Sequence, residues 1–175
     1  ATQNPIEMEG TYPLPAPEVD SFFFKRYLRS PKLGQLRDII ARNTETKASL
    51  SLETRVTRDE LLSARELVEG YPIADALLDY AARLIQATHP DAGEAPESVR
   101  KFVAYGASPR AGISLVAGAK AHAFLHGASN VRTEDLHAVF PMALNHRVLL
   151  NFKAQSEGVE VERLLADVLR HVKPV

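Results

Sequence analysis

Residues 106–127 read GASPRAGISLVAGAKAHAFLHG, and this stretch decides the fold. Serine is a good N-cap and proline suits the first helical position, so Ser108 and Pro109 predict the start of a helix. The helix is expected to run to about Leu125, with Gly127 closing it. Small side chains along it imply that neighbouring helices approach closely: Gly112, Ala117, Gly118, Ala119, Ala121 and Ala123.

Arg110 lies in the first turn of this helix, which is the unfavourable end for a cation. The helix dipole disfavours a positive charge there by up to ~1 kcal/mol. A bound anion, most plausibly a phosphate held by the helix N-terminus and the arginine together, would account for the placement. On the local residues alone, an exposed arginine that tolerates the dipole stays equally open.

The composition is that of a globular protein rather than a general nucleic-acid binder. Of 175 residues, 45% are hydrophobic and 25% are charged, as in soluble domains with a real core. A net charge of −1 and a sequence pI of about 6.7 argue against the basic surface that nucleic acid requires. The absence of Cys excludes a disulfide framework and a thiolate metal site.

The N-terminus begins ATQN, without a Met, a basic stretch or the apolar stretch of a signal peptide. No apolar run approaches membrane-spanning length. We therefore expect a piece of a longer chain, in a cytoplasmic setting.

The first part of the chain is expected to hold one strand and one helix. Frequent prolines predict a loop over residues 5–18. The aromatic run 22–28 has the length of a buried strand. Apolar spacing predicts a helix over residues 30–43, and the polar residues 44–56 are expected to be a linker.

From residue 57 onward the pattern is helical and predicts a small bundle. Thr57 and Glu60 form a capping box for a helix that Gly70 ends. Further helices are expected from near Pro72, from a cap at Thr133, and over the apolar repeat at 161–169.

Short extended stretches accompany these helices. Residues 89–96 are predicted to be a loop, and residues 99–105 a short strand or an extended approach to Ser108. One minor hairpin is expected from around Val131 and Leu149. The predicted fold class is therefore mainly α.

Four motifs together resemble the MoxR family of AAA+ ATPases. They are ATQNP at 1–5, EGTYPLP at 9–15, GASPRA at 106–111, and NHRV at 145–148 after the helix that opens with TED at 133–135. Each motif is weak alone, but their order and spacing cover essentially the whole chain.

The resemblance implies a domain map. Residues 1–50 would be the C-terminal part of a truncated α/β nucleotide-binding core, contributing its last strand or strands and a helix. Residues 57–175 would be the helical lid domain, with one small hairpin. The full-length parent would bind ATP and Mg²⁺, assemble as a homo-oligomeric ring, by resemblance a hexamer, and remodel or mature partner proteins in a chaperone-like way. A protein with a von Willebrand A-type domain is an implied partner.

The glycine-rich phosphate loop is missing from these residues. No Gly-x-x-x-x-Gly-Lys-Ser/Thr occurs in the 175 residues, so the phosphate charge cannot be neutralised by that loop. The piece alone is expected to be inactive and to hold no tightly bound cofactor.

Three positions carry the family's chemistry by resemblance. Asn4 would be the first sensor, which orients the attacking water, although an Asn before Pro5 ordinarily marks a turn. Arg110 would be the second sensor, contacting the β- or γ-phosphate, with Ser108 and Pro109 shaping the helix N-terminus.

The arginine-finger position departs from the family. MoxR-like sequences carry Leu-Asp-Arg-Phe, whereas residues 19–22 read Val-Asp-Ser-Phe. Ser21 brings no positive charge to a neighbouring subunit's nucleotide, and such a finger contributes ~10³ to 10⁵ in rate. Either Lys25 or Arg26 substitutes, or the ATPase is slow or degenerate; ordinary solvation of both cations is the favoured interpretation.

Other polar and aromatic residues are given structural roles. Ile73 and Tyr80 lie where related lids line adenine, but core packing is favoured for Ile73 and a half-buried surface position for Tyr80. His122 and His126 share a helical face without a third ligand, so no metal site is predicted. The acidic residues near the N-terminus are expected to be a solvated loop: Glu7, Glu9, Glu18 and Asp20.

Two other classes of function compete with the ATPase. A non-catalytic helical interaction or scaffold module with a degenerate ATPase site would also explain Ser21. A helical transcription regulator is disfavoured by the near-neutral charge.

Overall fold

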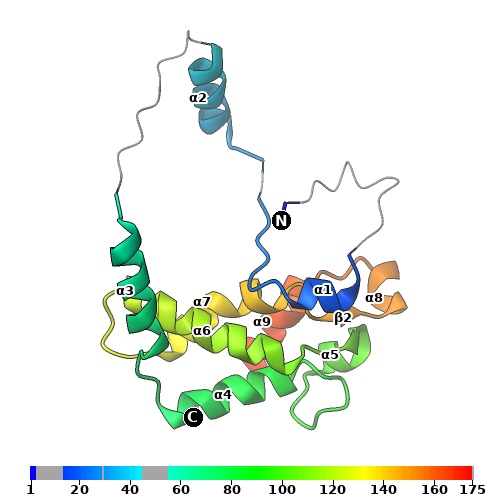
Figure 1. The fold of residues 1–175 in the computed structure, drawn as a ribbon. Helices are drawn as coiled ribbons and strands as arrows, with labels where there is room; N and C mark the ends of the chain where they lie inside the picture. The colour runs from blue at the N-terminus through cyan, green and yellow to red at the C-terminus, as the bar shows by residue number, and fades with distance from the viewer. Residues whose placement is uncertain (3–13, 29, 45–54, 175) are drawn as a thin grey trace. The chain divides into compact units, whose positions relative to one another are not determined.

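The computed structural model describes residues 1–2, 14–28, 30–44 and 55–174, and it divides into two compact units. The larger unit comprises Ala1–Lys25 with Leu67–Val175, and the smaller comprises Arg26–Glu66. Figure 1 labels the elements. Those of the larger unit are α1 (Ala16–Asp20), α4 (Asp75–Gln86), α5 (Glu97–Phe102), β1 (Val103–Tyr105), α6 (Pro109–Leu125), α7 (Thr133–Leu144), β2 (Leu149–Leu150), α8 (Phe152–Ser156) and α9 (Val161–His171).

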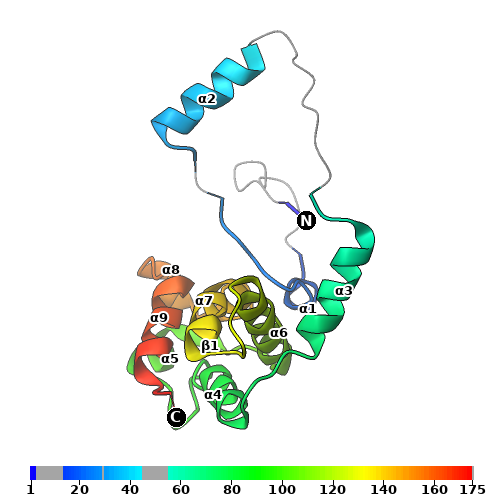
Figure 2. The same ribbon diagram turned by 90° about the vertical axis from the view of Figure 1, so that its left-hand side faces the viewer.

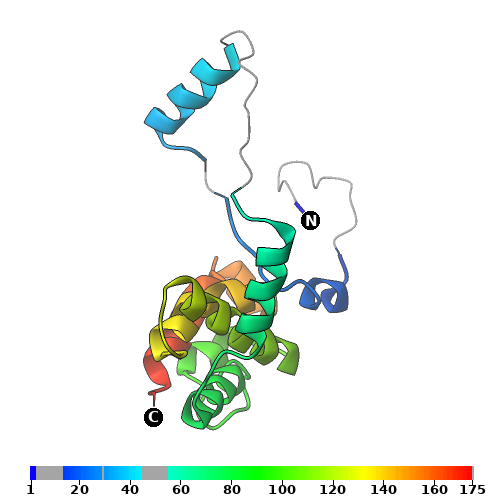
Figure 3. The same cartoon turned by 60° about the vertical axis from the view of Figure 1, so that its left-hand side comes forward.

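Four helices build the core of the larger unit. The central α6 contacts both α4 and α7, and α9 packs against α7 (Figures 1 and 2). Figure 3 shows the red α9 lying against the yellow α7. One face of α6 is fully buried: Ala111, Leu115, Ala119 and Ala123. This face packs against larger side chains of α4 and α7, namely Tyr80, Leu84, Leu136 and Phe140. The predicted close packing on small residues of α6 is therefore confirmed.

The bounds of α6 coincide with the predicted helix. It begins at Pro109 and its C-cap is His126. Gly127 follows with φ +64°, a left-handed conformation that glycine adopts without a side-chain penalty. The prediction that Gly127 closes this helix is confirmed.

A two-stranded antiparallel sheet completes the lid. Val103 pairs with Leu150, and Tyr105 pairs with Leu149. The predicted hairpin was right about Leu149 and wrong about Val131, which is fully buried and donates its N–H to the carbonyl of Pro72 at 3.0 Å. The strand predicted over 99–105 is helical in α5 up to Phe102, and only its last three residues pair. The fold class is confirmed as mainly α.

The aromatic run 22–28 is not a buried strand. Its described residues form no strand, and Phe23 is 47% exposed. Side chains of residues 145–147 hydrogen-bond its backbone carbonyls, and these bonds replace a strand partner. The predicted loop over 5–18 is also interrupted, because α1 starts at Ala16 with Pro17 in its first turn.

Several helix ends differ from the predictions by a few residues. The helix expected near Pro72 begins at Asp75. Thr133 is the first residue of α7 rather than its cap; Arg132 is the cap residue, and its N–H donates to the Asp135 carboxylate at 2.8 Å. The short α8 was not predicted, and the Asn151 side chain caps it by accepting from the Ala154 N–H.

The smaller unit contains α2 (Leu33–Thr44) and most of α3 (Arg58–Glu69), whose last residues belong to the larger unit. The predicted helix over 30–43 is confirmed as α2. The capping box is confirmed too, because the Thr57 N–H donates to Glu60 at 2.8 Å and the Glu60 N–H to the Thr57 hydroxyl at 3.3 Å. The Thr57 N–H and the Thr57 hydroxyl both donate to the Glu60 carboxylate, and these two bonds lower the pKa of Glu60.

The boundary predicted between residues 50 and 57 falls largely outside the described residues, so the two-domain map stays a prediction. Among the described helices, none is both long enough and apolar enough to cross a bilayer.

Candidate functional site

Three segments of the larger unit meet at the carboxylate of Asp20, the last residue of α1. The Ser108 hydroxyl lies 3.0 Å from both carboxylate oxygens, and Arg147 Nε lies 3.1 Å from Oδ1. Arg110 Nη1 lies 3.6 Å from Oδ2. The side chain of Asp20 is only 19% exposed, so the prediction of a solvated acidic loop is wrong for this residue.

Ser108 occupies the N-cap position of α6 but does not cap the helix with its side chain. Its hydroxyl donates to the Asp20 carboxylate, a charge-assisted bond, and its oxygen accepts no N–H of the first turn. Pro109 is the first helical residue, as predicted, and no acidic side chain occupies the first turn of α6. Ser108 therefore joins α6 to α1.

Arg147 is buried at the centre of this arrangement, with its side chain 2% exposed. Burial lowers the pKa of its guanidinium, and the Asp20 carboxylate opposes that shift. Sequence reasoning missed Arg147 and Asp20 as site residues, although NHRV was noted as a motif. The available signal was an arginine three residues after the apolar pair Ala143 and Leu144, with which α7 ends.

Arg110 is 66% exposed and makes a long contact to Asp20. A hollow of about 300 Å³ lies beside it. Two arginines and one carboxylate line this hollow, which leaves one positive charge in excess. Its lining residues are Pro17, Asp20, Tyr105, Gly106, Ser108, Arg110, His146, Arg147 and Leu149.

His146 also lines the hollow and does not add a charge near neutral pH. Burial, together with the nearby cations Arg147 and Lys25, lowers the pKa of His146. The hydrogen bond to the Phe22 carbonyl acts in the opposite direction, but the net shift is downward. That bond measures 2.9 Å from Nε2. The excess positive charge is therefore carried by Arg110.

An apolar groove of about 440 Å³ runs between α4 and α6 and begins at Pro109. Its apolar walls come from both helices: Leu78, Ala81, Ala82, Ile85, Ile113 and Val116. Tyr80 does not reach this groove, because it is fully buried and its hydroxyl lies 2.8 Å from His137 Nε2. Ile73 packs against the core. The expected core packing of Ile73 is confirmed, whereas the half-buried surface position expected for Tyr80 is wrong, because Tyr80 is fully buried.

The remaining predicted positions lie apart from this cluster or outside the description. Asn4 lies outside the described residues, so its role stays a prediction. Ser21 is exposed and its hydroxyl donates to the Glu18 carbonyl at 2.6 Å. His122 and His126 stack at 4.0 Å, and His122 Nδ1 lies 2.7 Å from the buried Asp135, which favours packing.

Known proteins resemble this chain over nearly its whole length. The family model of the AAA lid domain matches residues 96–171. Chaperone MoxR1 of Mycobacterium tuberculosis is 36% identical over 174 residues, which is 98% of this chain and 45% of that protein. Protein MoxR of Methylorubrum extorquens is 29% identical over 163 residues, covering 86% of this chain and 47% of that protein.

A solved structure shares the fold described above. The crystal structure of a candidate ATPase from Cytophaga hutchinsonii superposes with a TM-score of 0.92 at 33% identity. The match covers 99% of this chain and 52% of that one. The chain therefore spans about half the length of the curated relatives it matches.

Proposed function

The chain belongs to the MoxR family of AAA+ ATPases, and on that premise we propose that it is the C-terminal part of an enzyme that binds and hydrolyses ATP with Mg²⁺. The energy of hydrolysis would serve to remodel or mature partner proteins. Arg110 is the observation that carries the proposal, because it is an exposed cation at the start of a long helix beside a hollow with excess positive charge.

The proposed role of Arg110 is that of the second sensor. A β- or γ-phosphate would take the guanidinium from Asp20, since the phosphate groups of ATP together carry more negative charge than the single carboxylate at 3.6 Å. Ser108 and Pro109 hold the start of α6 in place for this contact. The apolar groove next to Pro109 suits an uncharged ring of the nucleotide.

ATP itself supplies the phosphoryl group for transfer, and Mg²⁺ supplies charge neutralisation. The 175 residues contain no phosphate-binding glycine loop, so we expect them alone not to hydrolyse ATP. Asn4 is proposed as the first sensor. Ser21 stands at the arginine-finger position without a charge, which predicts a slow enzyme.

The proposed assembly is a homo-oligomeric ring, a hexamer by family resemblance, in the cytoplasm. A protein with a von Willebrand A-type domain is a proposed partner on the same ground. Nucleic acid is not proposed as a binding partner, because the net charge of the chain is −1.

The test is a titration of the full-length protein with fluorescent ATP. Removing a charge-assisted hydrogen bond costs about 1.5–3 kcal/mol, so Arg110→Ala is expected to weaken binding roughly 10- to 100-fold. Arg163→Ala, an exposed arginine of α9, is the matched control and should leave the affinity unchanged. Absence of ATP binding, or equal affinities for both variants, would refute the proposal.

A second candidate function is a scaffold with a degenerate ATPase site, and Ser21 is the observation that favours it. A protein of this kind would bind its partner in the absence of nucleotide. Loss of partner binding on ATP removal would exclude it.

A further inference from the structure

We infer that Arg147 is a positioning residue that fastens residues 20–25 to the lid, so that position 21 moves together with the lid helices. The functional meaning of this anchor rests on the proposed function, because position 21 matters for a neighbouring subunit only in an assembled ATPase. The anchor itself is a property of the larger unit, which includes Ala1–Lys25.

The guanidinium of Arg147 binds three backbone carbonyls of the segment. Its Nη2 donates to the carbonyls of Asp20 at 2.9 Å and Phe22 at 2.8 Å, and its Nη1 donates to the carbonyl of Phe23 at 3.3 Å. These carbonyls lie on both sides of Ser21. Position 21 is therefore held between two backbone contacts to one side chain.

The same guanidinium is fixed from the lid side. Nη1 donates to the Ala143 carbonyl at 2.6 Å, and Nη2 donates to the Ser114 hydroxyl at 3.1 Å. Ala143 belongs to α7 and Ser114 belongs to α6. Arg147 thus connects two lid helices to the segment, which requires the planar, five-donor geometry that arginine has and lysine lacks.

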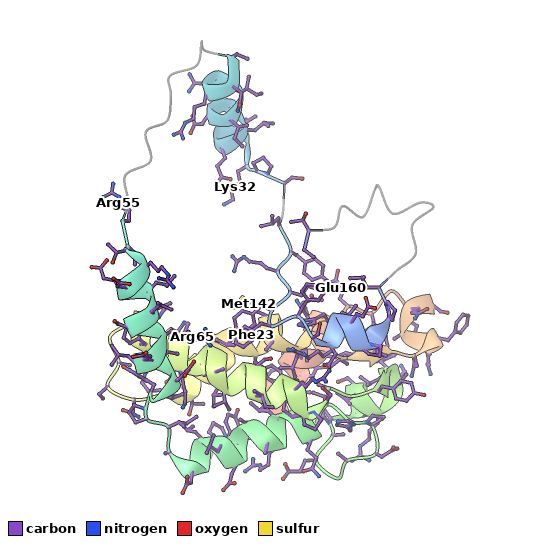
Figure 4. The ribbon with its side chains drawn as sticks, viewed as in Figure 1. Phe23, Lys32, Arg55, Arg65, Met142 and Glu160 are labelled. Atoms are coloured by element: carbon purple, nitrogen blue, oxygen red, sulfur yellow. The ribbon has the colours of Figure 1, made fainter. Side chains whose placement is uncertain are left out.

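Neighbouring residues extend the attachment along the segment. The Asn145 amide donates to the Lys25 carbonyl at 3.1 Å, and the Lys25 N–H donates to the Met142 carbonyl at 3.0 Å. Figure 4 labels Phe23 and Met142 where the segment crosses α7. Backbone groups at both ends of the segment therefore bond to the lid.

Side-chain packing adds a contact that is independent of these hydrogen bonds. A Cβ atom at Gly118 of α6 would lie 2.6 Å from Cζ of Phe24 and 2.7 Å from Cγ1 of Val139. Only a glycine leaves room for the Phe24 ring at this place. The ring is seated on the helix backbone, between α6 and α7.

These contacts predict rigid coupling between lid orientation and position 21. A phosphate that binds Arg110 acts on α6, and α6 holds Asp20 through Ser108 and Arg147 through Ser114. Any rotation of the lid would therefore carry position 21 with it. In a ring, this would move the finger position relative to the adjacent nucleotide.

The test measures distances between spin labels in the 175-residue chain, which contains no native Cys. One pair is Ser21→Cys with Ala166→Cys, which joins the segment to α9. The reference pair is Ala138→Cys with Ala166→Cys, which joins two lid helices at exposed positions. We expect the two pairs to give distance distributions of equal width.

Variants then separate positioning from general stability. Arg147→Ala and Arg147→Lys should broaden only the pair that includes position 21, at least twofold. Val99→Ala, a buried truncation in α5, lowers stability without touching the segment and should leave both pairs narrow. Arg147→Lys keeps a positive charge near Asp20. If Arg147→Ala does not fold, the test relies on Arg147→Lys.

A broad distribution for the position 21 pair in the unsubstituted background would overturn the inference, as would unchanged widths in the Arg147 variants. These measurements use no nucleotide. Their failure would leave the ATP proposal standing, and absence of ATP binding would leave the anchor standing.

Discussion

Asp20 and Arg147 lie 127 positions apart in the sequence, and their side chains form an ion pair at 3.1 Å inside the lid unit. The pair connects the end of α1 to the turn after α7. The remaining carboxylate oxygen of Asp20 faces Arg110, so one acidic residue serves both the buried and the exposed arginine. This sharing underlies the first prediction.

Asp20→Asn is expected to strengthen the binding of an anion at Arg110. The substitution removes a charge that competes with phosphate for the guanidinium, while the amide oxygen can still accept from Ser108 and Arg147. An exposed ion pair is worth up to ~1 kcal/mol, so the affinity for pyrophosphate should rise roughly fivefold at low salt. A chemical-shift titration of the 175-residue chain measures it.

Glu18→Gln is the matched control for this change, because it removes the same charge from an exposed position on the same helix. Its affinity for pyrophosphate should stay near that of the unsubstituted chain. Equal or weaker binding by Asp20→Asn would contradict competition at Arg110.

Gly118→Ala and Gly112→Ala are expected to change stability in opposite directions. Both glycines lie in α6, where alanine is favoured by up to ~1 kcal/mol. At Gly118 the new methyl would overlap Phe24 and Val139, and such overpacking costs about 1–3 kcal/mol. At Gly112 the new methyl would lie 3.5 Å from Cγ1 of Ile85, an ordinary van der Waals contact.

Urea denaturation of both variants provides the measurement. Because the gain in helix propensity is the same, the difference between the two unfolding free energies reports the overlap with Phe24 and Val139 together. If Gly118→Ala proved as stable as Gly112→Ala, the seating of Phe24 on α6 would be wrong.

Ser21→Arg is expected to raise the turnover of the full-length ATPase. It restores the family's residue at an exposed position, and arginine fingers contribute ~10³ to 10⁵ in rate. A gain of at least tenfold is expected, and it should appear only at protein concentrations that allow subunits to assemble. Steady-state ATP hydrolysis against protein concentration measures both features.

Ser156→Arg, an exposed serine of α8, is the control and should not change turnover. A gain from Ser21→Arg that is independent of protein concentration would contradict action on a neighbouring subunit.

His146 is expected to make folding sensitive to mildly acidic pH. Its pKa in the folded protein is lowered below the ordinary value of 6.5, mainly by burial. The unfolded chain therefore takes up the proton first. The stability that neutral His146 provides is full above about pH 6.5 and is lost as the pH falls toward the folded pKa.

His146→Gln should flatten this part of the profile, whereas the exposed His171→Gln should preserve it. Unfolding free energies from urea titrations between about pH 5 and about pH 8 measure the slope. A slope that persists unchanged in His146→Gln would assign the effect to another group.

Local patterns predicted much of this fold because the interactions that they encode are local. The start of α6 at Pro109 and its closure at Gly127 follow from residues within the helix and its ends. The capping box between Thr57 and Glu60 spans three residues and forms as expected. Ordered motifs also indicated the family.

Other features could not be predicted, because they depend on which distant groups meet. The aromatic run 22–28 is rich in residue types that favour strands, but a strand forms only where a neighbouring strand offers free backbone groups. Here Arg147, His146 and Asn145 satisfy its carbonyls instead. In the same way, the Ser108 hydroxyl bonds to the distant Asp20 and does not cap its own helix.

The sequence by itself determined the longer helices α4, α6, α7 and α9, the close packing on small residues of α6 and the placement of Arg110 in the first turn of α6. Only the tertiary structure decided that Asp20 is the partner of Arg110 and that Arg147 is buried between α6, α7 and residues 20–23. The physical reason is range: a helix satisfies its backbone within four residues, whereas a buried charge must find its counter-charge wherever the fold brings one.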